Sequence, residues 1–258
     1  MKGLVDGFSI FGFNIKFYGI IMASAMLIGV LLACKNAKHR DLTNDNIYTL
    51  ALFVLPLAVI GARLFYVLGD PPDNFAQVFK IWEGGMSIYG GVIGGAVGVA
   101  IYCLVFKKNF LALADVACVS LILGQAIGRW GNFFNQEVYG GLVTNPSWQW
   151  FPFAVLLNNG EWHYALFFYE SLINLAIFFG LMVLLKKTKT RGYVASAYLV
   201  SYGIIRFILE PLREQQYNLM LFGLKLSSVT SVIAVIAGIV MFVLIYTKSR
   251  RAKKGEQK

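Results

Sequence analysis

The sequence predicts an all-α polytopic membrane protein with about seven transmembrane helices, and three observations lead to this fold class. First, 58% of the 258 residues are hydrophobic and only 14% are charged, whereas soluble globular proteins carry roughly 25% charged residues. Second, the chain contains seven apolar runs, each close to the length of about 20 residues that a helix needs to cross a bilayer. Third, Lys and Arg are concentrated in alternate connections between these runs.

The seven apolar runs differ in how clearly they predict a helix. The fourth is the weakest, because it is short and contains the ionisable residue Asp115. The third carries five glycines at three- and four-residue spacing, which lets a neighbouring helix approach its backbone closely. We therefore expect spans at residues 17–34, 47–68, 88–106, 111–127, 166–185, 193–210 and 226–246.

The distribution of positive charge predicts the orientation of the chain. Of its 23 Lys and Arg residues, 15 lie in alternate connections and at the C-terminus, in the segments 35–40, 107–108, 186–191 and 248–258. The positive-inside rule places these segments in the cytoplasm, and seven spans then place the N-terminus outside. Membrane topology therefore explains the net charge of +10, and the charge does not indicate a nucleic-acid partner.

One integral-membrane domain is expected over residues 1–247, followed by a basic, disordered cytoplasmic tail at 248–258. The longest connection, at 128–165, is rich in Trp and Phe, which favour the membrane–water interface. We expect it to form a partly membrane-lying extracytoplasmic head between spans four and five. The three cysteines form no CxxC pair and the two histidines are far apart, so the sequence indicates no metal site.

A first polar cluster directly follows the fourth span, in the stretch GRWGNFFNQEVYG at 128–140. It contains Arg129, Asn132, Asn135 and Glu137, and its glycines allow a ligand to approach the backbone. One interpretation is a snorkelling arginine in a polar loop. The other is a site for phosphate oxygens, which the planar fork of an arginine can bind in pairs.

A second polar cluster lies on the sixth predicted helix. Tyr202, Arg206 and Glu210 recur at four-residue spacing and so share one face, with Arg213 just beyond. An Arg206–Glu210 pair within the helix is the simpler explanation. Pro211, however, disfavours helical backbone at Glu210, so the face ends at an irregular turn. An arginine inside an apolar span also needs a buried anionic partner or ligand.

Three further polar residues lie near the ends of spans: Tyr18 in the first, Tyr89 beside the glycines of the third and Glu170 in the fifth. Interfacial tyrosines and a structural hydrogen-bond partner are the simplest roles for them. Together with the arginines they predict a cavity at the outer leaflet, with few acids to neutralise its positive charge. An anionic lipid head group is the natural ligand, which leaves open a lipid-modifying enzyme and a lipid or anion transporter.

The stretch at 128–140 resembles the signature of bacterial prolipoprotein diacylglyceryl transferases, G-R-x-G-N-F-x-N-x-E-x-x-G, and it meets every fixed position up to Gly140. The seven-span layout with an outside N-terminus agrees with that family. The resemblance covers nearly the whole chain, because further segments occur in the family's order: IKFYG at 15–19, GARLFYV at 61–67, GGMSIYGGVIGG at 84–95, FFYES at 167–171 and YGIIRFILEPLRE at 202–214.

The resemblance implies a specific reaction. Enzymes of this family transfer the diacylglyceryl group of phosphatidylglycerol to the thiol of the lipobox cysteine in prolipoprotein signal peptides. A thioether forms and glycerol phosphate leaves, which is the first step of bacterial lipoprotein maturation. The resemblance further implies a multi-pass protein of the bacterial plasma membrane whose site faces the outer leaflet. Its partners would be phosphatidylglycerol, prolipoproteins and membrane lipids, with no cofactor.

The resemblance also implies roles for the polar clusters. Arg129 and Arg206 would raise the thiolate fraction of the substrate cysteine, and Arg129 would hold the lipid phosphate. Both arginines would stabilise the leaving phosphate. The residues that would orient these arginines or line the phosphatidylglycerol site are Asn132, Asn135, Glu137, Gly140, Tyr18, Tyr202, Glu210 and Arg213.

Two segments depart from the family's pattern. Tyr89 stands where many members carry a histidine, in an HGG run, that has been proposed as the base, and the family motif HPTxLYE reads YALFFYE at 164–170. Because tyrosine titrates at about pH 10, we expect the catalytic role of Tyr89 to be hydrogen-bond donation, while the arginines lower the pKa of the substrate thiol. The alternatives to an enzyme are a carrier or flippase for anionic lipids and a lipid-dependent scaffold.

Overall fold

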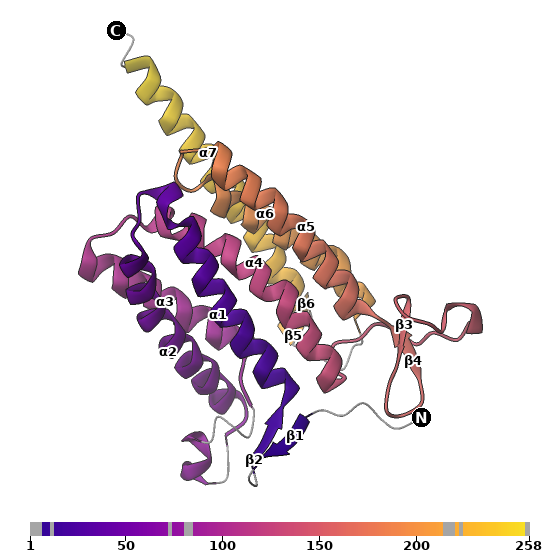
Figure 1. Cartoon of the computed structure of the whole chain (residues 1–258). Coiled ribbons are helices and arrows are strands. Elements are labelled where there is room, and N and C mark those ends of the chain that lie inside the picture. The colour runs from indigo at the N-terminus through magenta and orange to yellow at the C-terminus, as the bar shows by residue number, and fades with distance from the viewer. Residues whose placement is uncertain are drawn as a thin grey trace. The chain divides into compact units, whose positions relative to one another are not determined.

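The computed structural model describes residues 7–10, 13–71, 74–79, 85–213, 220–221 and 224–255. Within these residues it contains seven helices long and apolar enough to cross a membrane, which confirms the predicted number of spans (Figure 1). They are α1 (Phe17–Ala37), α2 (Asn44–Gly69), α3 (Ile88–Phe106), α4 (Phe110–Asn135), α5 (Leu166–Lys187), α6 (Tyr193–Leu209) and α7 (Leu226–Gly255).

Short elements connect the helices. Among the described residues, four of them are 3-10 helices: η1 (Lys38–Arg40), η2 (Phe75–Phe79), η4 (Pro146–Trp148) and η5 (Glu210–Leu212). The strands in the described part of the chain pair as three antiparallel hairpins, β1 (Gly7–Ile10) with β2 (Phe13–Lys16), β3 (Ala154–Leu156) with β4 (Trp162–Tyr164), and β5 (Met220–Leu221) with β6 (Leu224–Lys225). In the β3–β4 hairpin, Val155 pairs with His163.

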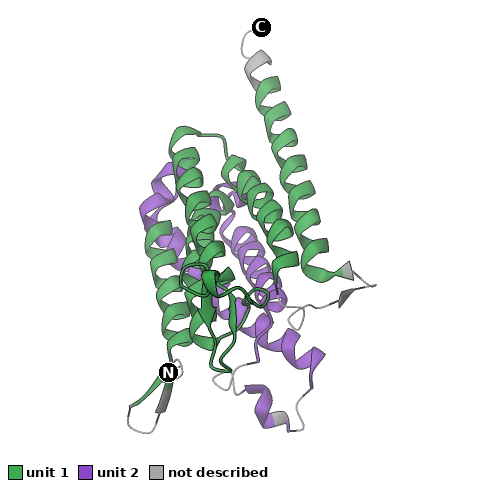
Figure 2. Ribbon diagram, turned by 90° about the vertical axis from the view of Figure 1, so that its right-hand side faces the viewer, with its two compact units in different colours: residues 1–33, 114–258 green, residues 34–113 purple. Residues whose placement is uncertain are grey.

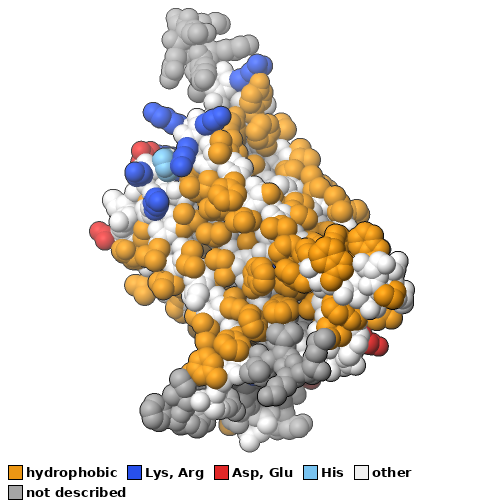
Figure 3. Space-filling model, turned by 45° about the vertical axis from the view of Figure 1, so that its right-hand side comes forward, with side chains coloured by type: hydrophobic (Ala, Val, Ile, Leu, Met, Phe, Trp, Pro, Cys, Tyr) orange, Lys and Arg blue, Asp and Glu red, His pale blue; other side chains and the backbone are white. Residues whose placement is uncertain are grey.

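The chain folds as two compact units (Figure 2). The larger consists of residues 1–33 and 114–258, and the smaller of residues 34–113. Apolar side chains cover most of the face visible in Figure 3, and charged side chains are few on it. Leu52 and Leu104, for example, are 74% and 80% exposed. Exposed leucines on long apolar helices are the surface of a protein surrounded by lipid, and the chain is a multi-pass membrane protein.

The smaller unit is built on close packing of α2 against α3. A Cβ atom on Gly90 would lie 2.2 Å from the carbonyl oxygen of Gly61, and one on Gly94 would lie 2.1 Å from that of Leu57. The two backbones are therefore in direct contact, as the glycine spacing predicted. At the start of α2, the Thr43 hydroxyl accepts a hydrogen bond from the backbone N–H of Asn46, whose side chain accepts one from the Thr43 N–H in return.

The larger unit has a hydrophobic core between α4, α5 and α6. This core contains Val119 and Ile122 from α4, Leu181 and Leu185 from α5, and Val194 and Tyr198 from α6. Asp115, which made the fourth run look weak, is fully buried, and its carboxylate accepts hydrogen bonds from the backbone N–H groups of Gly192 and Ala195 at 2.8 and 2.9 Å. It thereby caps the start of α6 and ties that start to α4.

Two helices, α4 and α7, continue eight or nine residues beyond their predicted ends, whereas α1, α2 and α5 pass theirs by three residues or fewer. α4 reaches Asn135, where we expected the head to begin at residue 128, because the polar side chains of its last turns hydrogen-bond to one another. α7 continues through the basic residues to Gly255, so the prediction of a disordered tail from residue 248 was wrong over that stretch. Lys, Arg and Ala are good helix formers, and no glycine or proline interrupts them before Gly255.

Candidate active site

The last turns of α4 carry a chain of hydrogen bonds. The Nη1 of Arg129 donates to the Oδ1 of Asn132 at 3.5 Å, and the Nδ2 of Asn132 donates to the Oε1 of Glu137 at 3.0 Å. Asn135 donates to the same carboxylate oxygen at 3.4 Å. Glu137 can turn back toward the helix because Gln136, the residue after α4, has a positive φ of 51°. The four residues of the first predicted cluster therefore form one group.

Glu170, in the first turns of α5, joins the two predicted clusters. One carboxylate oxygen pairs with the Nε of Arg129, and the other lies 3.7 Å from the Nη1 of Arg206. The side chain of Glu170 is only 5% exposed. A buried carboxylate between two guanidinium groups holds both of them in place, because moving either arginine away would leave a carboxylate oxygen buried without its cation.

The end of α6 carries the second predicted cluster. The Nη2 of Arg206 lies 3.0 Å from Glu210 Oε2, which confirms the pair within the helix, and the Nη1 of Arg213 lies 3.9 Å from the same oxygen. The hydroxyl of Ser227, in α7, donates to the other oxygen of Glu210. Glu210 keeps helical backbone, with φ −58° and ψ −41°, and the chain continues through Pro211 as the 3-10 helix η5, so the expected irregular turn at Glu210 was wrong.

The arginine cluster, which we define as Arg129, Arg206 and Arg213, has one positive charge more than the two carboxylates that form ion pairs with it. Its three guanidinium groups face two buried carboxylates, those of Glu170 and Glu210. Among the residues that the structure describes, the Nη1 of Arg206 and the Nε of Arg213 are buried without an acceptor at hydrogen-bond distance, and both oxygens of Glu170 and the Oε2 of Glu210 are buried without a donor in hydrogen-bond geometry. Buried donors of this kind are normally satisfied, so the cluster has unused capacity to bind an anion.

Arg213 lies just beyond the sixth span, in backbone pairing with Gly140. Burial, with a smaller contribution from the positive charge of Arg206, lowers the pKa of Arg213 to about 10. Its guanidinium therefore remains protonated at neutral pH, and the cluster keeps its positive charge. Gly140 is needed at this crossing, since a Cβ atom there would lie 2.8 Å from the Cβ of Tyr164.

A small pocket opens onto the arginine cluster. Tyr202 lies on its wall and stacks against Tyr198, with ring centroids 5.6 Å apart and planes 11° apart. Tyr18, from α1, packs against α4 instead, because a Cβ atom on Gly131 would lie 2.8 Å from the Tyr18 ring. The residues lining the pocket are Arg129, Glu170, Asn174, Tyr202, Ile205, Arg206 and Leu209.

Tyr89 is the one predicted site residue that belongs to the smaller unit, where it lies half-buried in the first turn of α3. Its catalytic role therefore stays a prediction. Sequence reasoning gave Glu170 only a structural role and did not select Asn174 or Ser227 at all. The signal for Glu170 was present, since a carboxylate at membrane depth is costly unless it meets a cation. Asn174 follows it by one helical turn, on the same face.

The fold and the site together define a class of protein: a multi-pass membrane protein with a partly neutralised arginine cluster at the ends of α4 and α6. The model of the family described as prolipoprotein diacylglyceryl transferase matches residues 7–244. A phosphatidylglycerol–prolipoprotein diacylglyceryl transferase of Clostridium perfringens is 38% identical over 255 residues, which are 96% of this chain and 97% of the relative.

Two further relatives carry the same name. The protein from Clostridium botulinum strain Loch Maree is 40% identical over 92% of this chain and 95% of its own length. The protein from Clostridioides difficile strain 630 is 37% identical over 94% of this chain and 96% of its own length. The chain belongs to the prolipoprotein diacylglyceryl transferase family.

Proposed function

We propose that this protein transfers the diacylglyceryl group of phosphatidylglycerol to the cysteine thiol of a prolipoprotein lipobox. The observation that carries this proposal is the arginine cluster, which has one charge more than its two paired carboxylates and two buried donors without an acceptor among the described residues. A phosphodiester offers one negative charge and oxygens that accept paired hydrogen bonds, which match a guanidinium fork. The names of the relatives supply both substrates.

In the proposed reaction, the sulfur of the substrate cysteine attacks the glyceryl carbon that bears the phosphate. The carbon–sulfur bond forms while the carbon–oxygen bond to phosphate breaks, and glycerol phosphate departs with the electron pair. Charge on the leaving oxygens increases in the transition state, so Arg129 and Arg206 stabilise that state more than the bound lipid. Glu170 and Glu210 keep the two guanidinium groups in place before the substrate arrives.

The thiol must lose its proton for this attack, because the thiolate is the nucleophile. Positive charge from the arginine cluster lowers the pKa of a thiol beside it, and the released proton passes to water or to the departing phosphate. Tyr89 donates a hydrogen bond in this scheme and does not act as the base, since tyrosine titrates at about pH 10. A Tyr89→Phe variant that lost turnover while still binding phosphatidylglycerol would overturn this assignment.

The proposed orientation places the reaction at the outer leaflet of the bacterial plasma membrane. The Lys- and Arg-rich connections face the cytoplasm, the N-terminus lies outside, and the segment between α4 and α5 forms an extracytoplasmic head. Residues 1–247 act as one catalytic domain in this scheme. A prolipoprotein signal peptide, which crosses the membrane from the cytoplasm, would then present its cysteine on the same side as the arginine cluster.

A direct test combines the purified protein, phosphatidylglycerol and a lipobox peptide, with mass spectrometry to detect a diacylglyceryl thioether on the peptide. We expect product with the parent protein and none with Arg129→Ala. Arg129→Lys keeps the charge without the planar fork and should retain only a small fraction of the rate. Lys189→Ala, which removes a cation from the exposed α5–α6 connection, is the control and should react like the parent.

The same assay separates a transferase from a carrier. A folded parent that binds phosphatidylglycerol but forms no thioether would refute the transferase. Movement of fluorescent phosphatidylglycerol between leaflets of a vesicle, lost in Arg129→Ala, would then support a carrier.

A further inference from the structure

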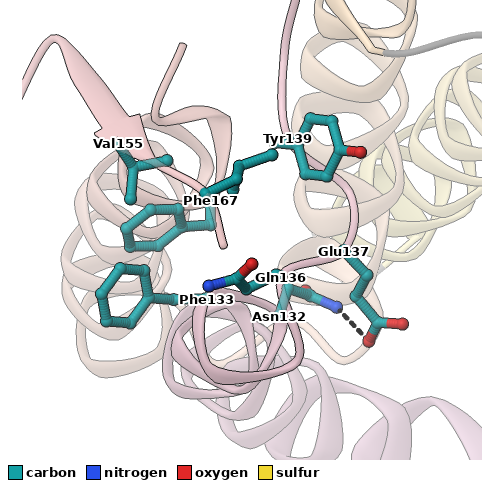
Figure 4. Close-up of a pocket in the computed structure, with 8 residues that line it drawn as sticks. Asn132, Phe133, Gln136, Glu137, Tyr139, Val155 and Phe167 are labelled. Atoms are coloured by element: carbon teal, nitrogen blue, oxygen red, sulfur yellow. Dashed lines mark hydrogen bonds between the residues drawn. The ribbon is translucent and has the colours of Figure 1, made fainter. Parts of the chain in front are cut away.

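A second pocket lies at the end of α4. Asn132 and Glu137, which are hydrogen-bonded to each other, line it, and Asn132 also accepts a hydrogen bond from Arg129. Its walls are mostly apolar and come from α4, the β3–β4 hairpin and the start of α5. It has room for roughly one methyl-sized group. Figure 4 shows its lining residues, which are Asn132, Phe133, Gln136, Glu137, Tyr139, Val155, Leu157 and Phe167. We call it the head pocket.

Gln136 is the unusual residue of the head pocket. Its φ of 51° lies in the left-handed region, where a glycine would be unstrained. Its Oε1 accepts a hydrogen bond from the backbone N–H of Asn158 at 2.8 Å, which fixes the orientation of the amide. The Nε2 is consequently turned the other way, and within the described part of the chain it is buried without an acceptor. In Figure 4 this amide lies between the aromatic rings and Glu137.

Among the described residues, the Nε2 of Gln136 therefore keeps an unused capacity to donate a hydrogen bond. Asn132 connects this donor to the arginine cluster, because its side chain lines the head pocket and also accepts from Arg129.

We propose that the head pocket binds the acceptor peptide, holding a small side chain next to the reacting cysteine. The Nε2 of Gln136 donates to a backbone carbonyl of that peptide. This inference rests on the transferase proposed above. The alternative ligand is the lipid, but its phosphate is matched by the arginine cluster, and its acyl chains need far more room. A glycerol hydroxyl would find Asn132 and Glu137 already bonded to each other.

The first test measures KM separately for the two substrates in Gln136→Glu. This variant keeps one side-chain oxygen that can accept the hydrogen bond from the Asn158 N–H. It replaces the donating Nε2 with a second carboxylate oxygen, which repels a carbonyl oxygen of the peptide. We expect KM for the peptide to rise by about tenfold or more, with KM for phosphatidylglycerol unchanged. Gln149→Glu is the matched control, because the Gln149 amide donates to the Val143 carbonyl at 2.9 Å within the same segment.

The second test changes the size of the head pocket. Leu157→Ala removes a buried wall, and should shift the preference between peptides with Ala or Val beside the cysteine toward Val. A changed KM for phosphatidylglycerol, or an unchanged peptide KM in Gln136→Glu together with an unchanged Ala-to-Val ranking in Leu157→Ala, would overturn this inference. Absence of any thioether from the parent would instead refute the transferase itself, so the two failures are distinct.

Discussion

Replacing Glu170 with glutamine tests whether the arginine cluster is positioned by that carboxylate. Glu170 is buried and pairs with both Arg129 and Arg206. Removing one member of a buried ion pair costs about 3–5 kcal/mol, and we take the lower end because the amide oxygen can still accept one hydrogen bond. If that cost falls on the alignment of the two guanidinium groups, about 3 kcal/mol corresponds to a loss of roughly 150-fold in rate.

The assay is the thioether-forming reaction, with kcat and KM for phosphatidylglycerol measured separately. We expect kcat to fall by about two orders of magnitude. KM should stay constant or decrease, because three guanidinium groups then face one carboxylate instead of two. Glu161→Gln, at an exposed position of the β3–β4 hairpin, is the control and should leave kcat unchanged. A Glu170→Gln protein with the parent's kcat would refute the reasoning, since it would show that Glu170 only competes with the substrate phosphate.

Three further predictions follow from single contacts. Asp115→Ala removes both hydrogen bonds that cap α6, and should lower the free energy of unfolding by about 3 kcal/mol, measured as a lower midpoint in a thermal-shift experiment in detergent. An unchanged midpoint would contradict the cap. Gly131→Ala places a Cβ atom 2.8 Å from the Tyr18 ring, and should cost about 1–3 kcal/mol through displacement of that ring; Gly141→Ala, which meets no atom within 4 Å, should be neutral. Because burial lowers the pKa of Arg213 to about 10, phosphatidylglycerol binding should be constant from about pH 7 to 9 and weaken as the pH rises through 10. Arg213→Gln should bind more weakly and remove this decline, and a decline of equal size in the variant would assign it to another group.

The spans could be predicted from the sequence because their signal is local. A run of apolar residues has one stable arrangement in a bilayer, a helix with its backbone groups bonded internally. The end of α4 could not be predicted in this way, since Arg129 and Asn132 look like the start of a loop. They are helical because each has a partner close to the helix: Arg129 pairs with Glu170 of α5, and Asn132 donates to Glu137, whose side chain is directed back toward α4.

For the candidate site, the sequence indicates individual residues and their spacing, but not the network of contacts that joins them. The spacing of Arg206 and Glu210 indicates one helical face, and their ion pair confirms it. Nothing in the spacing relates Glu170 to Arg129, because they lie on different helices that tertiary packing brings together. The head pocket was missed for the same reason: Gln136 and Leu157 lie on different segments and share a cavity only after the β3–β4 hairpin packs against α4.

The cap that Asp115 provides has a consequence for the distant arginines. An α-helix rises 1.5 Å and turns about 100° per residue, so Arg206 lies about 16 Å along α6 from the capped N–H of Ala195. Fixing the first turn sets the rotational phase of every later residue, and a slip of one residue would swing Arg206 away from Glu170 toward the lipid. Asp115 thus acts on the alignment of the site from the far end of the helix. A loss of turnover in an Asp115 variant would then indicate that α6 has rotated and that Arg206 is misaligned, because Asp115 lies at the opposite end of α6 from the arginine cluster.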